Sequence, residues 1–329
     1  MVMSVNHPID ILLPALNEEA SIARTIEEYS GEFPEARFVV VDNGSDDDTH
    51  ARAAEILDQL RLTHELVVEP RRGKGFAVRA GLEKCRGDVV VMADADATYD
   101  AKDARRLVET LHQYELDLVV GDRHSSGAYR SIQSSQIHRL GNRVMQSLVN
   151  RFYRCDLSDI LSGLRVMSRR FVDSYPCVVT GFELETDMTV HALDRQLRVR
   201  EVPVGYRPRI DGGSSKIRPL RDGIRLVRSV FGLYRKYKPL AFFGSVALIF
   251  ALFGSVAGAA PIYDWLVYRY VYRIPLAVLA SSLVVLAVLA VTVGLILDVL
   301  VDNARKQHAQ NVKLMDALRN SQRISRDES

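Results

Sequence analysis

Two carboxylates, Asp94 and Asp96, stand two residues apart directly after the apolar run Val89–Met92. Such a pair can hold one hard divalent cation, because these ions prefer oxygen ligands and often bridge a protein to phosphate. An acidic surface loop would have the same composition, so the triplet alone leaves both interpretations open. Its position at the end of a buried strand favours the metal site.

A basic, glycine-containing turn, Arg71-Arg72-Gly73-Lys74-Gly75, precedes a predicted helix. Glycines permit close backbone approach, and helix N-terminal amides together with Arg and Lys favour phosphate. The turn matches neither the GxGxxG nor the GxxxxGK[ST] pattern, so a Rossmann dehydrogenase or a P-loop ATPase is not supported. A solvated basic turn is the alternative to a phosphate site.

Further charged residues lie in the middle of the chain. Arg139, Arg143 and Arg151 fall on a predicted helix over residues 137–152, and their spacing places them on roughly one face. That face could contact a lipid phosphate through bidentate bonds, or it could be an ordinary charged surface. Residues 159–165, 181–185 and 206–216 are most simply polar surface loops when each is taken alone.

Alternating apolar strands and helices are predicted to position these residues. Strands are expected at 9–13, 38–41, 66–68 and 88–92, and helices at 18–29, 48–60 and 77–85. This order predicts an α/β fold with a parallel sheet covered on both faces. Ligands of such sheets bind outside the carboxyl ends of the strands. Polar clusters follow at 17–18, 42–45 and 94–96, at those ends.

Two long uncharged runs follow, Pro239–Ala260 and Ile274–Leu297. Each exceeds the ~20 residues that cross a membrane as a helix. Because they follow a complete polar domain, we expect two transmembrane helices rather than buried core helices. Arg and Lys residues flank both outer ends, so the positive-inside rule places both termini in the cytoplasm. Residues 224–234 predict an amphipathic helix in the headgroup region, with an ordinary surface helix as the alternative.

Bulk composition sets further bounds. The net charge of +2 gives no case for nucleic-acid binding. Three scattered cysteines, Cys85, Cys155 and Cys177, indicate unpaired thiols in a reducing compartment. The N-terminal residues lack a signal-peptide pattern, so we expect the first domain to stay in the cytoplasm. The expected organisation is a catalytic domain at 1–217, a juxtamembrane helix at 218–238, two transmembrane helices at 239–301 and a cytoplasmic tail at 302–329.

In their order along the chain, these clusters resemble family 2 glycosyltransferases with a GT-A fold, which is Rossmann-like with a mostly parallel sheet. The likeness is greatest to dolichyl-phosphate mannose synthases and bacterial polyprenyl-phosphate glycosyltransferases, and it runs from Leu12 to about Phe243. It rests on seven motifs in the family's order: 13–19, 41–49, 73–75, 94–99, 158–165, 182–185 and 201–216.

The resemblance implies roles for particular residues. The nucleoside pocket would be lined by Pro14, Ala15, Asn17, Glu18 and Asp42, and Arg72 and Lys74 would approach the donor diphosphate. Asp96 would be the main ligand of Mg²⁺ or Mn²⁺, with Asp94 its partner near the ribose or metal. Candidates for the acceptor phosphate or the donor diphosphate are Arg123, Arg139, Arg143, Arg209, Ser215 and Lys216. Asp159 and Ser162 would border the sugar and acceptor.

Three departures from the family pattern stand out. Asn43 replaces a second aspartate found in many relatives, and Thr98 replaces a frequent glutamine ligand. No QxxRW sequence is present, since the one tryptophan is Trp265, which speaks against a processive synthase.

The resemblance therefore implies an inverting transfer of sugar from a nucleotide donor, preferably a uridine one, to a polyprenyl phosphate at the cytoplasmic face of the cell (inner) membrane. We also expect a homo-oligomer. One alternative is a glycolipid synthase acting on diacylglycerol or another lipid hydroxyl, with Asp159, Glu183 or Glu185 as base. Another is a catalytically silent membrane scaffold or sugar-nucleotide sensor.

Overall fold

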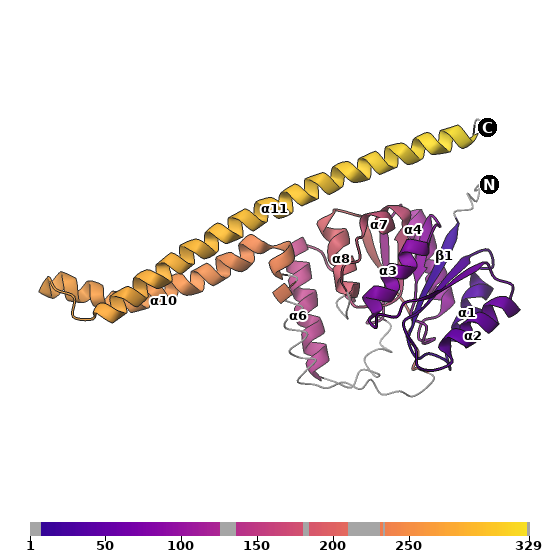
Figure 1. Cartoon of the computed structure of the whole chain (residues 1–329), viewed down its shortest axis with the longest axis horizontal. Coiled ribbons are helices and arrows are strands. Elements are labelled where there is room, and N and C mark those ends of the chain that lie inside the picture. The colour runs from indigo at the N-terminus through magenta and orange to yellow at the C-terminus, as the bar shows by residue number, and fades with distance from the viewer. Residues whose placement is uncertain (1–7, 126–135, 180–183, 210–230, 233, 328–329) are drawn as a thin grey trace. The chain divides into compact units, whose positions relative to one another are not determined.

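The computed structural model describes residues 8–125, 136–179, 184–209, 231–232 and 234–327 (Figure 1). The chain divides into two compact units, residues 1–225 and 226–329. The first contains a mixed α/β sheet domain, and the second contains two long helices.

The first unit is built on one seven-stranded sheet. Its strands are β1 (Ile9–Ala15), β2 (Arg37–Asp42), β3 (His64–Val68), β4 (Val89–Met92), β5 (Leu118–Asp122), β6 (Arg165–Ser168) and β7 (Val199–Pro203). They lie in the order β3-β2-β1-β4-β6-β5-β7. All neighbouring pairs are parallel except those of β6, which runs antiparallel to β4 and β5. The predicted, mostly parallel sheet is confirmed.

Helices cover both faces of this sheet. They are α1 (Ile22–Glu32), α2 (Thr49–Gln59), α3 (Lys74–Lys84), α4 (Ala101–Gln113), α7 (Arg169–Ser174) and α8 (Leu184–Asp194). A further helix, α6 (Gln136–Tyr153), packs against α8. Successive strand residues point to opposite faces, so Ile11 and Leu13 enter a core with α1, α2 and α4. Leu12 enters a second core with α3, α7 and α8. The central strands β1, β2 and β4 are therefore buried on both sides, as their continuous apolar runs predicted. Strand β3 lies at the edge of the sheet and is partly exposed, with Val68 58% exposed.

Two helix starts differ from the sequence expectation. Helix α1 begins at Ile22 rather than at Glu18, because residues 17 and 18 bond elsewhere. The Asn17 backbone amide donates to Ser45 Oγ in the loop after β2, and the Glu18 backbone amide donates to Thr49 Oγ1 at the start of α2. Helix α3 begins at Lys74 rather than at Ala77. The basic turn therefore runs directly into a helix N-terminus.

The second unit is a pair of packed helices, α10 (Pro239–Tyr268) and α11 (Ile274–Asp327). Gly254 and Gly258, four residues apart, bring α10 close to α11: a Cβ at Gly254 would lie 3.3 Å from Leu283 Cβ, and one at Gly258 3.5 Å from Ala280 Cβ. Small residues at such spacing are typical of close helix packing in membranes. Both helices are long and apolar enough to cross a membrane, by length and composition.

Candidate active site

The carboxyl ends of β2, β1 and β4 meet at one edge of the sheet, since these strands are neighbours and parallel. Asp42, the loop 16–19 and the Asp94–Asp96 turn follow those ends. The topology thus brings together three of the clusters that the sequence predicted to share a ligand.

Asp96 is buried, and both of its carboxylate oxygens have partners. Its Oδ1 accepts from Thr98 Oγ1 at 2.6 Å, and its Oδ2 accepts from Arg209 Nε at 2.8 Å. Burial, together with the nearby charge of Asp94, raises the pKa of Asp96 above its ordinary value. An added cation at this carboxylate would relieve that penalty, because it would stabilise the ionised form.

Asp94 forms an ion pair with Lys74. Lys74 Nζ lies 2.6 Å from Asp94 Oδ1 and 2.6 Å from Glu185 Oε1 at the start of α8. Burial opposes the charge on both partners, but their attraction outweighs it: the pKa of Asp94 is lowered and that of Lys74 is raised. The lysine therefore stays charged between two carboxylates.

The residues present suit an open metal site rather than a closed one. Among the described residues, no three His, Cys, Asp or Glu side chains gather into a potential metal-binding group. Asp96 and Asp94 would offer hard oxygen ligands and would leave positions for phosphate oxygens and water, as Mg²⁺ and Mn²⁺ prefer. Arg209 pairs with Asp96 in this structure, so it would have to release that oxygen to a metal.

The predicted nucleoside residues gather beside this turn. Pro14 and Ala15 end β1, and Asn17 Oδ1 accepts from the Asp46 amide at 2.9 Å. Asp42 is mostly buried; its Oδ1 accepts from the Ser45 amide at 3.0 Å. Glu18 is close enough to Asp96 to interact electrostatically. Burial first, and then the Asp96 charge, raise the pKa of Glu18 to about 7.

The arginines of the basic turn, residues 71–75, bond to neighbouring segments. Arg72 Nη2 donates to the Gly44 carbonyl at 3.1 Å and pairs with Asp46. Arg71 forms two hydrogen bonds with Glu69 through its guanidinium and lies 4.7 Å from the centre of the Phe76 ring. Of the predicted diphosphate residues, Lys74 contacts the Asp94–Asp96 turn, whereas Arg72 pairs with the loop after β2.

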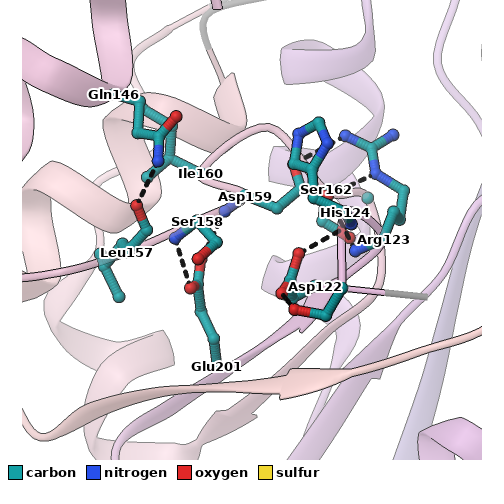
Figure 2. A network of polar contacts seen from close by, with 12 residues as sticks. Asp122, Arg123, His124, Gln146, Leu157, Ser158, Asp159, Ile160, Ser162 and Glu201 are labelled. Carbon is teal, nitrogen blue, oxygen red and sulfur yellow. Dashed lines mark hydrogen bonds and ion pairs between the residues drawn. The ribbon is translucent and has the colours of Figure 1, made fainter. Parts of the chain in front are cut away.

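A second polar network surrounds Asp159 (Figure 2). Arg123, just after β5, donates to it three times: Nε to Oδ2 at 2.7 Å, Nη2 to Oδ1 at 2.9 Å and the backbone amide to Oδ2 at 3.1 Å. Burial opposes the Asp159 charge, but Arg123 outweighs it and lowers the pKa of this carboxyl. Asp159 is thus an ionised carboxylate whose oxygens already accept hydrogen bonds.

The loop that carries Asp159 is fastened from two directions, as Figure 2 shows in part. Glu201 on β7 accepts from the amides of Ser158 and Asp159 at 2.5 and 2.7 Å. From α6, Gln146 Nε2 and Asn150 Nδ2 donate to the Leu157 carbonyl at 2.9 and 3.0 Å. The loop is therefore tied both to the sheet and to α6.

The remaining predicted phosphate residues are only partly described. Arg143 is exposed on α6, and Arg139 lies on the same helix, its side chain outside the described part. Ser215 and Lys216 fall outside the described residues, as does Glu183. The structure thus places Arg123 and Arg209 at the site and leaves the contacts of the others open.

Sequence reasoning gave no role to the residues that hold the Asp159–Arg165 segment in place. Arg165 is fully buried and donates to the carbonyls of Ser162 and Ile160 and to Thr189 Oγ1, at 2.8–2.9 Å. The Gly163 amide donates to Tyr99 Oη at 3.0 Å. The one available signal was the unusual polarity of residues 159–165 in an apolar setting.

Comparisons with known proteins agree with this architecture. A family model described as glycosyl transferase family 2 matches residues 10–175. Glycosyltransferase AglJ of Haloferax volcanii is 30% identical over 298 residues, which cover 90% of this chain and 95% of that protein. The low-salt glycan biosynthesis hexosyltransferase Agl6 of the same organism is 30% identical over 262 residues, or 77% of this chain and 61% of that protein.

A solved structure shares the fold of the sheet domain. It is the glucosyl-3-phosphoglycerate synthase of Mycobacterium tuberculosis in complex with Mn²⁺ and uridine-diphosphate-glucose. The TM-score is 0.55 at 25% identity, and the match covers 70% of this chain and 79% of that one. The sheet domain thus has the GT-A fold that the sequence predicted.

Proposed function

The chain belongs to glycosyl transferase family 2, and we propose that it moves a sugar from a uridine diphosphate donor onto a polyprenyl phosphate at the cytoplasmic face of a membrane. The observation that carries this proposal is the pairing of Asp94 and Asp96 with Lys74 and Arg209. Carboxylates and cationic side chains form ion pairs at this edge of the sheet, where Asp42 and residues 16–19 also lie. Such a site offers oxygen ligands to a cation and cations to a diphosphate.

On the donor side, Asp42, Pro14, Ala15, Asn17 and Glu18 would receive the nucleoside. A divalent cation held by Asp96 and Asp94 would offset the negative charge that develops on the leaving diphosphate. Lys74, Arg72 and Arg209 would stabilise the same charge from the protein side. The Mn²⁺ and nucleotide-sugar bound to the mycobacterial enzyme, and the hexosyltransferase name of one Haloferax relative, support a metal and a hexose donor.

The state of Asp159 supports a phosphate acceptor. A lipid hydroxyl would need a general base, and Asp159 is a poor one because Arg123 occupies both of its oxygens and lowers its pKa. A phosphate monoester has a second pKa of about 6, so it is largely ionised at neutral pH and needs no base. Arg123, Arg139, Arg143, Arg209, Ser215 and Lys216 are the proposed residues for binding it.

In the proposed step, a phosphate oxygen of the lipid attacks the anomeric carbon from the face opposite the diphosphate. A new carbon–oxygen bond forms as the bond to the diphosphate oxygen breaks, and the electron pair leaves with the diphosphate. The configuration at the anomeric carbon is inverted. Positioning and electrostatic stabilisation would supply most of the rate, because no proton has to move in this step.

The helix pair would anchor the catalytic domain to the membrane, where the proposed lipid acceptor resides. We propose that residues 1–217 form the catalytic domain and 218–238 a juxtamembrane helix. Residues 239–301 would cross the inner membrane twice and 302–329 would form a cytoplasmic tail. Both termini would then face the cytoplasm, and the helices could also support a homo-oligomer.

The test is transfer of radiolabelled sugar from a panel of UDP- and GDP-sugars to undecaprenyl phosphate, using the detergent-purified full chain with Mg²⁺, Mn²⁺ or EDTA. We expect a lipid-linked product from one donor, lost with EDTA and lost in a folded Asp96→Ala variant. An active Asp96→Ala enzyme would refute the metal assignment. Transfer to diacylglycerol but not to the lipid phosphate would favour the glycolipid synthase, and donor binding without transfer to any lipid would favour a sensor.

A further inference from the structure

Asn43 follows Asp42 at the end of β2 and is buried. Among the described residues, its carboxamide bonds to the turn at residues 69–73: Nδ2 donates to the carbonyls of Arg71 at 2.7 Å and Glu69 at 3.2 Å, and Oδ1 accepts from the Gly73 backbone amide at 2.8 Å. A carboxamide carries two donor hydrogens and an acceptor oxygen, and all are engaged here. The side chain acts as a clamp on one turn.

That turn has a conformation that needs support. Gly73 has φ of 144°, in the region open almost only to glycine, and it caps α3 at its N-terminus. Glu69 fastens the turn from the other side, since its Oε1 accepts from the Arg71 amide at 3.0 Å. The Asn43 carboxamide bonds to Glu69 and Gly73, the two ends of the turn, so this side chain determines where the chain enters α3.

The clamp joins the two ends of the proposed donor site. On one side, the Asn43 backbone N–H donates to the Ala15 carbonyl at 2.8 Å, next to the proposed nucleoside residues. On the other, the clamped turn delivers Lys74, whose Nζ meets Asp94 and Glu185. Arg72, on the same turn, donates a hydrogen bond from Nη2 to the Gly44 carbonyl in the loop after β2.

We propose that Asn43 is a positioning residue: its carboxamide holds the turn that carries Arg72 and Lys74 in register with the nucleoside pocket, so that the base and the diphosphate of one donor bind as a unit. This rests on the proposed nucleotide-sugar donor. It also gives a structural consequence to the departure from aspartate at this position. An ionised aspartate can only accept, so it would face the carbonyls of Arg71 and Glu69 without a hydrogen to donate.

Asn43→Asp tests the proposal, because it removes the donors with almost no change in shape. A matched control is Asn150→Asp on α6, where the amide likewise both donates to and accepts from one residue, Leu157, at 3.0 and 3.1 Å. The measurements are melting temperature and calorimetric affinity for UDP and UMP with Mn²⁺, on the full chain in detergent. GDP and GMP replace them if the wild type prefers guanosine.

We expect Asn43→Asp to weaken UDP binding about tenfold to a hundredfold, from lost and unsatisfied buried hydrogen bonds, while UMP binding changes by less than about threefold. Asn150→Asp should bind both nucleotides like the wild type. UDP affinity that is unchanged in Asn43→Asp, or UDP and UMP affinities that fall equally, would overturn the positioning role. If the wild type binds neither UDP nor GDP, the donor class itself fails, and the inference falls with it.

Discussion

At the scale of residues, the site is a set of ion pairs that a ligand could rearrange. Asp94 pairs with Lys74, Asp96 with Arg209 and Asp159 with Arg123. Buried charges are costly unless they are paired, so these contacts stabilise the site without ligand. A metal and a diphosphate bring opposite charges of their own. We expect Asp96 to exchange Arg209 for the metal, which frees the guanidinium for phosphate.

The prediction at this scale concerns the titration of Glu201. Burial raises the pKa of Glu201 to about 7, although the Ser158 and Asp159 amides oppose this. Between about pH 4.5 and 7 the folded protein therefore keeps a proton that the unfolded chain has lost, and stability falls as pH rises through this window. Glu201→Gln removes this group, so its melting temperature should fall less than that of the wild type between pH 5 and 7.5.

The control is Glu109→Gln, at an exposed glutamate on α4. Its melting curve should follow the wild type at each pH. Parallel pH profiles for the wild type and Glu201→Gln would contradict the assignment of this proton to Glu201.

At the scale of elements, the antiparallel strand β6 completes the site. Met92 at the end of β4 pairs with Arg165 at the start of β6. Because β6 runs the opposite way, the segment that enters it arrives at the same edge as the turn that leaves β4. Residues 159–164 consequently reach the Asp94–Asp96 turn. A parallel strand at this place would have delivered them to the far edge of the sheet.

Gly163 is where these two segments touch most closely. A Cβ on this residue would lie 2.2 Å from Asp94 Oδ2, and Lys74 holds that carboxylate in place. Gly163→Ala should therefore displace Asp94 and lower the turnover of sugar transfer about tenfold to a hundredfold, as small misplacements of catalytic groups do. Steady-state kinetics of the purified protein measure this.

Gly31→Ala is the control for this substitution, since a Cβ there meets nothing within 4 Å. It should keep wild-type turnover. A Gly163→Ala enzyme with wild-type turnover would show that the approach of the two segments is not needed for the reaction.

At the scale of the whole molecule, the helix pair α10 and α11 exposes a large apolar surface, which is unfavourable in water. On α10, Phe253 and Val256 are 64% and 76% exposed, and large apolar side chains continue along α11. Apolar surface favours burial by about 25 cal/mol per Å², so a lipid environment would stabilise these helices. Tyr263, Trp265, Tyr268, Tyr270 and Tyr272 near the turn between the helices are also exposed, as expected for residues at a membrane interface.

The prediction at this scale concerns the association of the helix pair with the membrane. The full chain should sediment with cell membranes, resist washing with alkaline carbonate and enter solution only with detergent, because its helices would lie in the hydrocarbon core. Protease added to inverted vesicles should degrade the sheet domain, and protease added to intact spheroplasts should not. Release by carbonate would indicate a peripheral protein, and digestion in spheroplasts would reverse the proposed orientation.

The sequence by itself determined the class of the protein, the elements β1 to β4 with α1, α2, α3 and α6, and the two long apolar helices. It did not predict the later elements of the sheet domain, β5, β6 and β7 with α4, α7 and α8. Strand runs such as Val89–Met92, the acids after them and the apolar runs from 239 and 274 are local patterns, and local periodicity and transfer energy can be read along a chain. Their order was enough to identify family 2. The predicted starts of α1 and α3 were wrong, because hydrogen bonds from other segments set the first residue of each helix.

Only the tertiary structure decided which charges meet. Lys74 and Glu185 are 111 residues apart, and Arg123 and Asp159 are 36 apart. No local pattern relates such residues, because their contact depends on the strand order and on the direction of β6. The same holds for Asn43, which from the sequence was a departure from a motif and in the fold bonds to the turn at residues 69–73. Pairing across a sheet is a property of its topology, and topology depends on the packing of the whole chain.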